Sequence, residues 1–241
     1  MKNISKYIIL SLLTLSVIGC KEEKEKPKVI YGKSETPKTA IKPDTSKISV
    51  ADLPIQMPGT SVLIHPIGAL SVSENRESKL ASSSSDRNQS FIVSNSNEFE
   101  ITGYLSNLKF QQIGSDSLSV LTEKPVMIER ITYLKNLADK TKKQILVYLI
   151  EDMDSNGDGK LDENDIKNLY ISDVTGKNFI KLSQEFQELI DWNLIESQNR
   201  LYFRTIEDIN KNGAFDKDDK VHYQYVDLLS KDLKVQEYNP V

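Results

Sequence analysis

The first feature of this sequence is a twelve-residue stretch in which oxygen-bearing side chains recur at alternate positions. It reads Asp154-Ser155-Asn156-Gly157-Asp158-Gly159-Lys160-Leu161-Asp162-Glu163-Asn164-Asp165. A calcium ion takes about six to eight hard oxygen ligands, and a loop of this length supplies them from positions one, three, five, seven, nine and twelve, with glycine at position six for a sharp turn. Gly159 stands at position six, and every ligand position offers an oxygen. The chemistry that this spacing favours is calcium binding.

This spacing resembles the EF-hand calcium-binding loop, and the resemblance is confined to the loop. It implies these ligands: Asp154, Asn156, Asp158, the Lys160 carbonyl, Asp162 directly or through water, and Asp165. Leu161 at position eight is the apolar residue that pins such a loop to its neighbour. A second register, from Asp152 to Glu163, also fits the letters, but it places Gly159 at position eight and Lys160 at a ligand position. We therefore prefer the register that begins at Asp154.

A second stretch repeats the pattern 208 − 154 = 54 residues later. It reads Asp208-Ile209-Asn210-Lys211-Asn212-Gly213-Ala214-Phe215-Asp216-Lys217-Asp218-Asp219. Its expected ligands are Asp208, Asn210, Asn212, the Ala214 carbonyl, Asp216 and Asp219. This loop offers three ligand carboxylates where the first offers four, so we predict two calcium sites of which the second is weaker. Both loops end in aspartate rather than glutamate, so the last ligand binds through one oxygen or leaves room for water.

The alternative interpretation is that both loops are hairpin turns that bind no metal, because aspartate, asparagine and glycine form turns and a long hairpin loop of this composition needs no ion. Two loops with glycine at position six and an apolar residue at position eight, in equivalent places, favour calcium over this alternative. The opening movement of calcium sensors requires paired helices, whereas strands are expected to flank these loops. We therefore expect the calcium ions to be structural.

The elements that must position the loops are expected to be β-strands. Residues 144–150 are a run of β-branched and aromatic residues, and residues 200–206 alternate between two faces. Two series of four strands are expected, at residues 127–134, 145–150, 169–172 and 179–182, and at residues 189–195, 201–206, 221–228 and 233–238. Each loop would join the second strand of its series to the third.

Four sequential strands per repeat resemble the blade of a β-propeller. We therefore expect an all-β fold of antiparallel four-stranded units resembling propeller blades. With an offset of 54 residues between the two loops, the chain has room for only three or four such units. An incomplete ring and a β-sandwich both remain open.

The N-terminal residues follow the pattern of a bacterial lipoprotein. Two lysines precede an apolar run, residues 7–18, which is shorter than the roughly 20 residues that span a bilayer. The run ends Val17-Ile18-Gly19-Cys20, which resembles the lipobox, where the small residue is cut away and the cysteine is acylated. Cys20 is the only cysteine, so no internal disulfide forms. We expect residues 1–19 to be a removed signal peptide and Cys20 to carry the lipid, including palmitate.

The residues after the expected anchor indicate location and domain limits. Lys21-Glu22-Glu23 is similar to the short signal that sends lipoproteins of some Bacteroidota to the outer face of the outer membrane. The resemblance implies a membrane partner and a location on the bacterial outer membrane, facing the exterior. Residues 20–58 are rich in Lys, Glu, Pro, Thr and Ser, which predicts a disordered tether. Residues 59–241 are expected to form one β-rich domain.

Composition and motifs narrow the function classes. The formal net charge is −4, and removal of residues 1–19, with two lysines and no acids, makes it −6, so no nucleic-acid partner is expected. No nucleophile-elbow, zinc-protease or phosphate-loop motif is present, and His65 and His222 are the only histidines. We therefore do not expect an enzyme or any catalytic residue.

The function that these patterns favour is that of a calcium-binding envelope lipoprotein. The alternative is a surface module that binds a glycan or a protein, or an accessory subunit of an outer-membrane complex. Four aromatic residues would form its stacking platform: Trp192, Tyr202, Tyr223 and Tyr225. Aromatic residues on strands are more often core residues, and the sequence does not identify such a partner.

Overall fold

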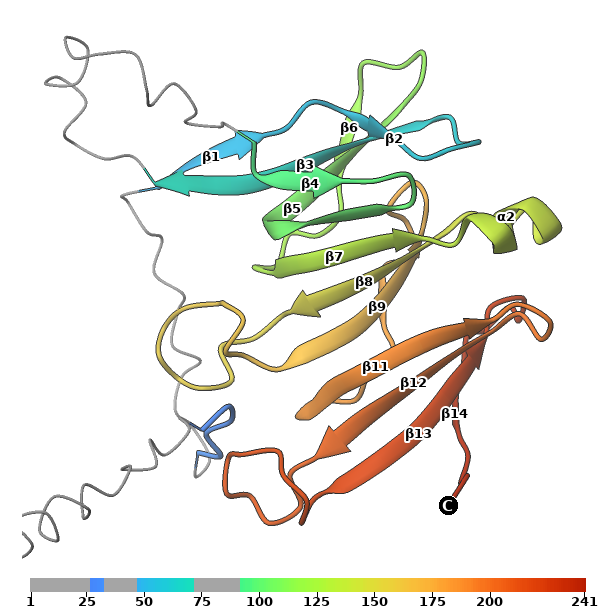
Figure 1. Ribbon diagram of the computed structural model, residues 1–241. Coiled ribbons are helices and arrows are strands. Elements are labelled where there is room, and N and C mark those ends of the chain that lie inside the picture. Colours follow the sequence, from blue (N-terminus) through green and yellow to red (C-terminus); the bar gives the residue numbers. More distant parts are fainter. Residues whose placement is uncertain (1–26, 33–46, 72–91) are drawn as a thin grey trace, which may run out of the picture.

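The computed structural model describes residues 27–32, 47–71 and 92–241 of the chain. These residues form two antiparallel β-sheets and one short helix (Figure 1). The expected signal peptide and the expected anchor residue, Cys20, lie outside the described residues. Within the described ranges, no helix has the length and apolar character needed to cross a membrane.

The larger sheet has ten strands. In chain order they are β1 (Lys47–Ala51), β2 (Ile55–Gln56), β3 (Val62–Ser71), β4 (Ser94–Ser96), β5 (Glu100–Gln112), β6 (Leu118–Val120), β7 (Met127–Tyr133), β8 (Ile145–Glu151), β9 (Lys167–Asp173) and β10 (Ile180–Lys181). The order across the sheet is β1-β3-β5-β7-β8-β9-β10, while β2 pairs with β3, and β4 and β6 pair with β5.

The smaller sheet has four strands in sequential order. They are β11 (Gln187–Ile195), β12 (Arg200–Glu207), β13 (Lys220–Asp227) and β14 (Val235–Glu237). The helix α2 (Lys135–Thr141) connects β7 to β8. The expectation of an all-β fold is therefore confirmed, and each strand of the two expected series begins and ends within two residues of its predicted limits.

The two series differ in how they enter the fold. The second series makes up the smaller sheet by itself. The first series is not a separate sheet, because β7 also pairs with β5 and the sheet continues to β1. Among the described residues the strands close no ring.

Strand β8 shows why the two sheets pack together. Leu146, Tyr148 and Ile150 lie in one core with residues of β3, β5 and β7. Ile145 and Val147 point to the other face and lie in a second core with residues of β11, β12 and β13. A strand that is buried on both faces needs a continuous apolar run, which is what residues 145–150 provide. The smaller sheet therefore covers one face of the larger sheet.

The helix α2 was not expected from the sequence, which predicted a polar turn there. Leu134, Leu137 and Ala138 are buried, so this short segment places its apolar residues on one helical face. Lys142 ends the helix in the left-handed conformation, with a φ of 64°. Three apolar residues among lysines give too weak a periodic signal for prediction.

The expected boundary at residue 58 is corrected by the first two strands. β1 and β2 pair with β3, and Met57 is buried in the first core. Residues 47–58 therefore belong to the folded domain and not to a tether.

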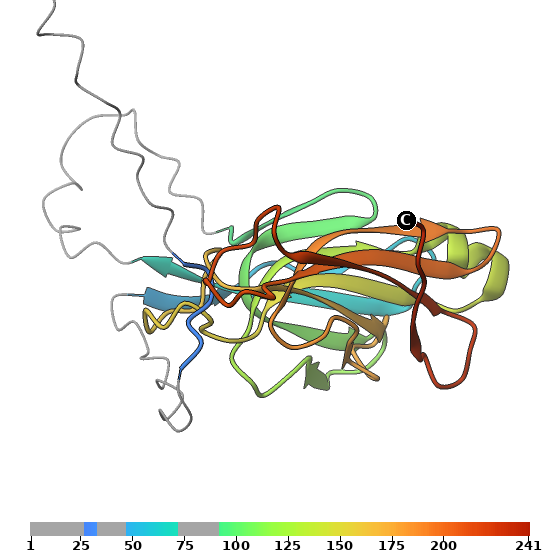
Figure 2. The same cartoon turned by 90° about the horizontal axis from the view of Figure 1, so that it is seen from below.

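Nearer the N-terminus, residues 27–32 pass beside the loop after β8 and the loop after β12, as both views show (Figures 1 and 2).

Candidate metal centre

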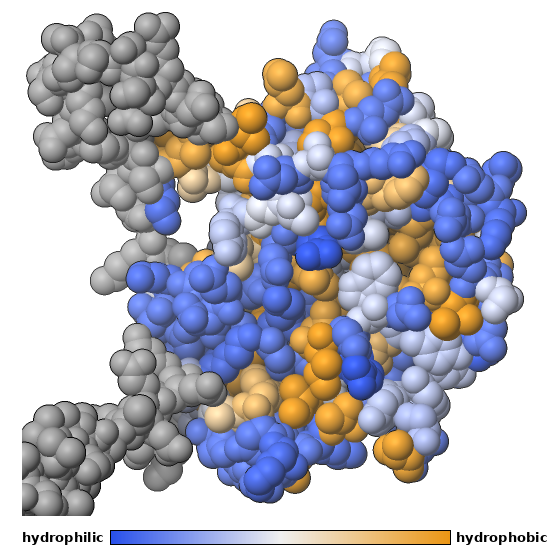
Figure 3. All heavy atoms as spheres, viewed as in Figure 1, coloured by the Kyte–Doolittle hydropathy of each residue, from blue (hydrophilic) through white to orange (hydrophobic). Residues whose placement is uncertain are grey.

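The two candidate calcium loops occupy equivalent hairpins. The first joins β8 to β9, and the second joins β12 to β13, each pair being antiparallel neighbours. Both loops lie at the same end of the molecule, opposite α2 (Figures 1 and 2). Hydrophilic residues cover this end in the space-filling view (Figure 3). The structure thus places each expected set of ligands in one hairpin loop.

In the first loop, the first and last ligand positions bind the loop backbone. Asp154 Oδ1 accepts a hydrogen bond from the Gly157 N–H at 2.7 Å, and its Oδ2 accepts one from the Gly159 N–H at 2.8 Å. Asp165 Oδ1 accepts from the Ser155 N–H at 2.8 Å, and its Oδ2 accepts from the Asp162 N–H at 3.0 Å. These carboxylates therefore hold the loop closed from both ends.

The second loop repeats this scheme except for the bond from position four to position one. Asp208 Oδ2 accepts from the Gly213 N–H at 2.7 Å, which is the bond from position six to position one. Asp219 accepts from the Ile209 N–H at 3.2 Å and from the Asp216 N–H at 2.9 Å, which are the bonds from positions two and nine to position twelve. Both loops thus have the same fold, although only about half of their residues match.

The side chains at the intermediate ligand positions also correspond. In both loops position three accepts from the N–H of position five, position five from that of position seven, and position nine from that of position eleven. Each bond leaves the accepting oxygen with a further lone pair. The ligand positions are therefore oriented by the backbone.

These contacts favour the register that begins at Asp154. The alternative first ligand, Asp152, is engaged outside the loop, where it accepts hydrogen bonds from Asn168 at 2.8 Å and from Tyr170 at 2.5 Å and pairs with Lys181 at 2.9 Å. The corresponding bonds across the loop are made by Asp154 and Asp165 instead.

Within the part of the chain that the structure describes, the carboxylates at the ligand positions have no ion-pair partner. None of the ion pairs within the described ranges includes a carboxylate at a ligand position of either loop. Asp165 is fully buried and Asp208 is 3% exposed. Burial raises the pKa of Asp165, although three backbone N–H groups oppose the shift. Buried carboxylates without a cationic partner fit the donor set that a bound cation would require.

The carboxylates of each loop are nevertheless not gathered around one point. Across the described residues, no three His, Cys, Asp or Glu side chains lie together in a group that could hold a metal ion. Part of each expected ligand set consists of asparagine and backbone oxygens instead. Calcium coordination by these loops stays a prediction.

Two buried residues near the first loop were missed by sequence reasoning. Ser155 lies at a position that is not a ligand, yet its Oγ accepts from the Ile166 N–H at 2.9 Å and donates to the Lys28 carbonyl at 2.8 Å. Glu151, at the end of β8, is fully buried, and neither of its carboxylate oxygens has a hydrogen-bond partner among the described residues. Burial raises the pKa of Glu151 to about 8. No spacing in the sequence marks either residue.

The two histidines occupy unrelated positions. His65 Nε2 lies 3.0 Å from Gln111 Oε1. His222 bridges two carboxylates, with Nε2 at 2.8 Å from Glu207 and Nδ1 at 2.9 Å from Glu237. The second arrangement ties β12, β13 and β14 together. Both carboxylates are 15 residues from the histidine, on neighbouring strands, so the sequence did not reveal them.

The four aromatic residues of the expected platform lie on two different faces. Trp192 is paired with the core residue Phe203, so it lies on the inner face of the smaller sheet. Tyr202 is paired with Tyr225, and these two residues lie with Tyr223 on the outer face. There they contact Tyr238, with ring centroids 5.4 to 6.1 Å from it.

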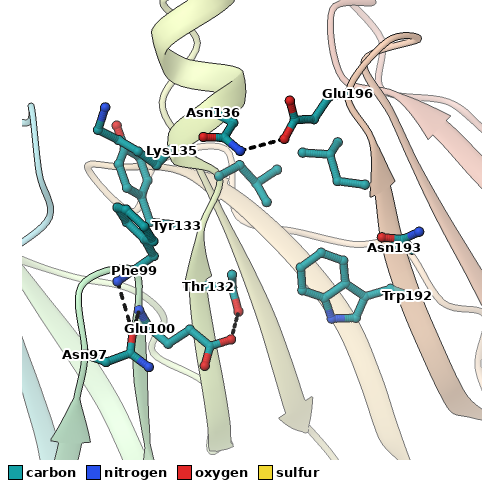
Figure 4. Close-up of a pocket in the computed structure, with 12 residues that line it drawn as sticks. Asn97, Phe99, Glu100, Thr132, Tyr133, Lys135, Asn136, Trp192, Asn193 and Glu196 are labelled. Carbon is teal, nitrogen blue, oxygen red and sulfur yellow. Dashed lines mark hydrogen bonds between the residues drawn. The ribbon is translucent and has the colours of Figure 1, made fainter.

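Trp192 points into a cleft between the two sheets (Figure 4). The cleft has a volume of about 460 Å³ and is lined mainly by polar side chains from β7, α2 and the segment before β5. Several of these side chains are hydrogen-bonded to one another. Asn136 donates to Glu196 at 2.6 Å, and Thr132 donates to Glu100 at 3.2 Å. Because Trp192 lies on the inner face of the smaller sheet, the cleft is separate from the tyrosines of the outer face.

Comparisons with known proteins gave no match: no model of a protein family, no curated protein and no solved structure is similar to this chain.

Proposed function

We propose that this protein is a calcium-binding envelope lipoprotein in which two EF-hand-type loops each hold one structural calcium ion. Each loop would belong to a four-stranded unit that resembles a propeller blade. The observation that supports this most directly is the shared hydrogen-bond scheme of two loops with different residues. A scheme that recurs position by position on two hairpins is more than a turn-forming composition requires.

The chemistry of the loops explains what the ion would contribute. Seven ligand-position carboxylates, four in one loop and three in the other, lie at one end of the molecule. These negative charges repel one another. A divalent cation would offset the repulsion and replace the water that surrounds the ligand oxygens. Because strands enter and leave both loops, the ion would stabilise two hairpins rather than open a groove. Extracellular modules bind calcium at about 0.1 to 1 mM.

The location is part of the proposal and is supported by the N-terminal residues. The apolar run that ends at Cys20 would be cleaved, and the acylated cysteine would hold the domain on the outer membrane, facing the exterior. The partner is then the membrane itself, with no nucleic acid and no catalytic role.

Calorimetry on residues 20–241 carrying Cys20→Ser would test the calcium sites. We expect saturable binding of two ions, loss of the tighter site in Asp154→Ala and loss of the weaker site in Asp208→Ala. The melting temperature should fall when a chelator is added, because an ion that binds only the folded state stabilises it. No heat and no melting shift at millimolar calcium would contradict the proposal.

Two carboxylates that lie in the loops but outside the ligand positions supply matched controls. Glu163→Gln and Asp218→Asn remove a charge at positions ten and eleven without removing a ligand. Both variants should keep two sites. Glu163→Gln also tests the register, since Glu163 would be the last ligand if the loop began at Asp152.

A second candidate function is glycan binding on the outer face of the smaller sheet. Tyr202 and Tyr225 lie 5.3 Å apart, and the Arg200 guanidinium lies 4.5 Å above the Tyr225 ring. Partly exposed tyrosines with bonded hydroxyl groups are suited to stacking on sugar rings. A glycan array should show binding that Tyr225→Ala removes and Trp192→Ala retains, because Trp192 lies on the other face. An array without signal would leave the calcium proposal alone.

A further inference from the structure

Residues 27–32, which we name the N-terminal strap, are bonded to both candidate calcium loops. The N–H groups of Lys28 and Val29 donate to the Gly213 carbonyl of the second loop at 2.7 and 3.2 Å. The Ile30 N–H donates to the Ser155 carbonyl of the first loop at 2.9 Å. One short segment therefore joins two loops that lie 54 residues apart in the chain.

The side chains of the strap are also held. Val29 is 2% exposed, and the Lys28 ammonium lies 2.6 Å from Glu188 of β11. The Tyr31 ring lies 6.1 Å from the ring of Phe186. Burial and the nearby Asp208 carboxylate raise the pKa of the Tyr31 hydroxyl to about 12. The strap thus has an apolar, an ionic and an aromatic contact in addition to its backbone bonds.

The fit between strap and loops is close enough to depend on glycine. A Cβ atom at Gly213 would lie 2.5 Å from the Val29 carbonyl oxygen and 2.7 Å from Pro27 Cβ. A Cβ atom at Gly157 would lie 3.3 Å from Ile30 Cδ1. The glycine at position 213 therefore has two uses. It permits the turn, with a φ of 85°, and it leaves the space, or seat, in which the strap lies against the loop.

The backbone of the strap binds loop oxygens that an EF-hand loop does not use for the ion. Gly213 and Ser155 stand at positions six and two, whereas the carbonyl ligand of such a loop is at position seven. The Tyr31 hydroxyl also bonds Asp208, the expected ligand at position one, but a carboxylate offers about four acceptor sites. The strap and an ion can therefore bind the same loop at the same time. Both require the loop to be in the closed conformation that its hydrogen bonds define.

We propose, on the basis of the calcium binding proposed above, that the N-terminal strap is a calcium-dependent clasp. Calcium closes the two loops and so creates the seat of the strap, and the docked strap in turn raises the affinity of both loops for calcium. The two binding events must favour each other by the same factor, because the coupling free energy between them is shared.

For a chain anchored at Cys20, docking sets the distance from the membrane. The docked strap begins 27 − 20 = 7 residues after the anchor, so the connection reaches at most about 25 Å. With the strap released, the connection runs to β1, which is 47 − 20 = 27 residues and at most about 95 Å. Calcium would therefore hold the loop end of the domain close to the lipid surface.

Amide hydrogen exchange on residues 20–241 with Cys20→Ser would test the clasp. In millimolar calcium the amides of residues 28–30 should exchange at least about tenfold more slowly than in chelator. Val29→Asp, which places a charge in the buried seat, should abolish this protection and weaken calcium binding about fivefold or more in calorimetry. Ile30→Pro, which removes the N–H donor to Ser155 together with the isoleucine side chain, should act in the same direction.

The control is Leu53→Asp, which introduces the same charge at a side chain that is 86% exposed and away from the loops. This variant should keep both the protection and the affinity. Two bound calcium ions with equal strap exchange in calcium and in chelator, or with wild-type affinity in Val29→Asp and Ile30→Pro, would overturn the clasp alone. An absence of calcium binding in the parent chain would overturn the clasp together with the proposed function.

Discussion

The loop of residues 154–165 and the loop of residues 208–219 have one backbone scheme but different means of supporting it. The first loop has glycine at both left-handed positions, four and six, with φ values of 74° and 82°. The second loop reaches the same conformation with Lys211 at position four, with a φ of 57°. It also has one carboxylate fewer at its ligand positions. The hydrogen-bond scheme therefore tolerates different residues. The two loops differ in the backbone strain at position four and in the charge at their ligand positions.

The strands that carry the loops differ as well. Three residues before the first loop lies Glu151, which is fully buried without a hydrogen-bond partner among the described residues. Three residues before the second loop lies Thr205, which is equally buried but donates to Gln187 at 2.6 Å. Among the described residues, the unpaired buried group of the first hairpin is therefore an ionisable carboxyl, whereas that of the second hairpin is the neutral amide of Gln224.

The largest difference that we expect between the two hairpins concerns pH. The folded chain holds a proton on Glu151 up to about pH 8, whereas the unfolded chain releases it near the usual carboxyl pKa, about 4.5. Stability should therefore fall as pH rises through this window and level off above it. The charged groups near Glu151 are Lys167 and Lys28, which oppose this shift, and Glu129, which adds to it.

Thermal melts between pH 5 and pH 9 in chelator would measure this effect. The melting temperature of the parent chain should fall by several degrees more than that of Glu151→Gln, which cannot ionise. Thr205→Val, at the counterpart position, should shift the melting temperature equally at every pH. Parallel pH profiles for the parent chain and Glu151→Gln would show that Glu151 is ionised or solvated in the folded state.

A smaller effect is expected from exchanging the charge at position five. Asp158→Asn and Asn212→Asp have nearly equal volume and move one carboxylate from the first loop to the second. Each change should alter the calcium affinity of its loop by about tenfold, which is about 1.4 kcal/mol. In the double variant the second loop should become the tighter site. Calorimetry that shows an unchanged order would mean that ligand charge does not distinguish the two sites.

The smallest effect concerns position four. Lys211→Gly should relieve a left-handed conformation that costs a residue with a side chain about 1 kcal/mol. We expect the melting temperature to rise by about 2 to 4 °C in calcium. Lys217→Gly, at an exposed position with ordinary φ, is the control and should give no gain. An equal rise in both variants would trace the effect to the lost lysine charge instead.

The predictable part of the fold was the part with a local pattern. Residues 145–150 form β8 because their apolar run suits a strand that is buried on both faces. The alternation in residues 200–206 assigned Leu201 and Phe203 to one face and Tyr202 and Arg204 to the other, and the structure buries the first pair. α2 and strands β1 to β6 were not among the predicted elements. Most of them are short, and β1 to β6 are held mainly by pairing with one another or with β7.

The candidate site was predictable to the same degree. The twelve-residue spacing identified each loop, since a loop that binds an ion through its own residues is a local feature. Trp192 and the tyrosines were grouped as one platform, yet they lie on opposite faces of the smaller sheet. Ser155 and Glu151 had no signal, because their roles depend on neighbours that lie elsewhere in the chain.

The sequence by itself determined the strands of the two series, the two hairpin loops and the order of oxygen donors within them, because side-chain period and turn chemistry act over a few residues. Only the tertiary structure decided that the first series of strands joins a ten-stranded sheet and that residues 27–32 lie against both loops. The strap is short, and Lys28, its one charged residue, pairs with Glu188, 160 residues away. Such a contact forms because the folded loops present a seat for it, and no local pattern in residues 27–32 encodes that seat.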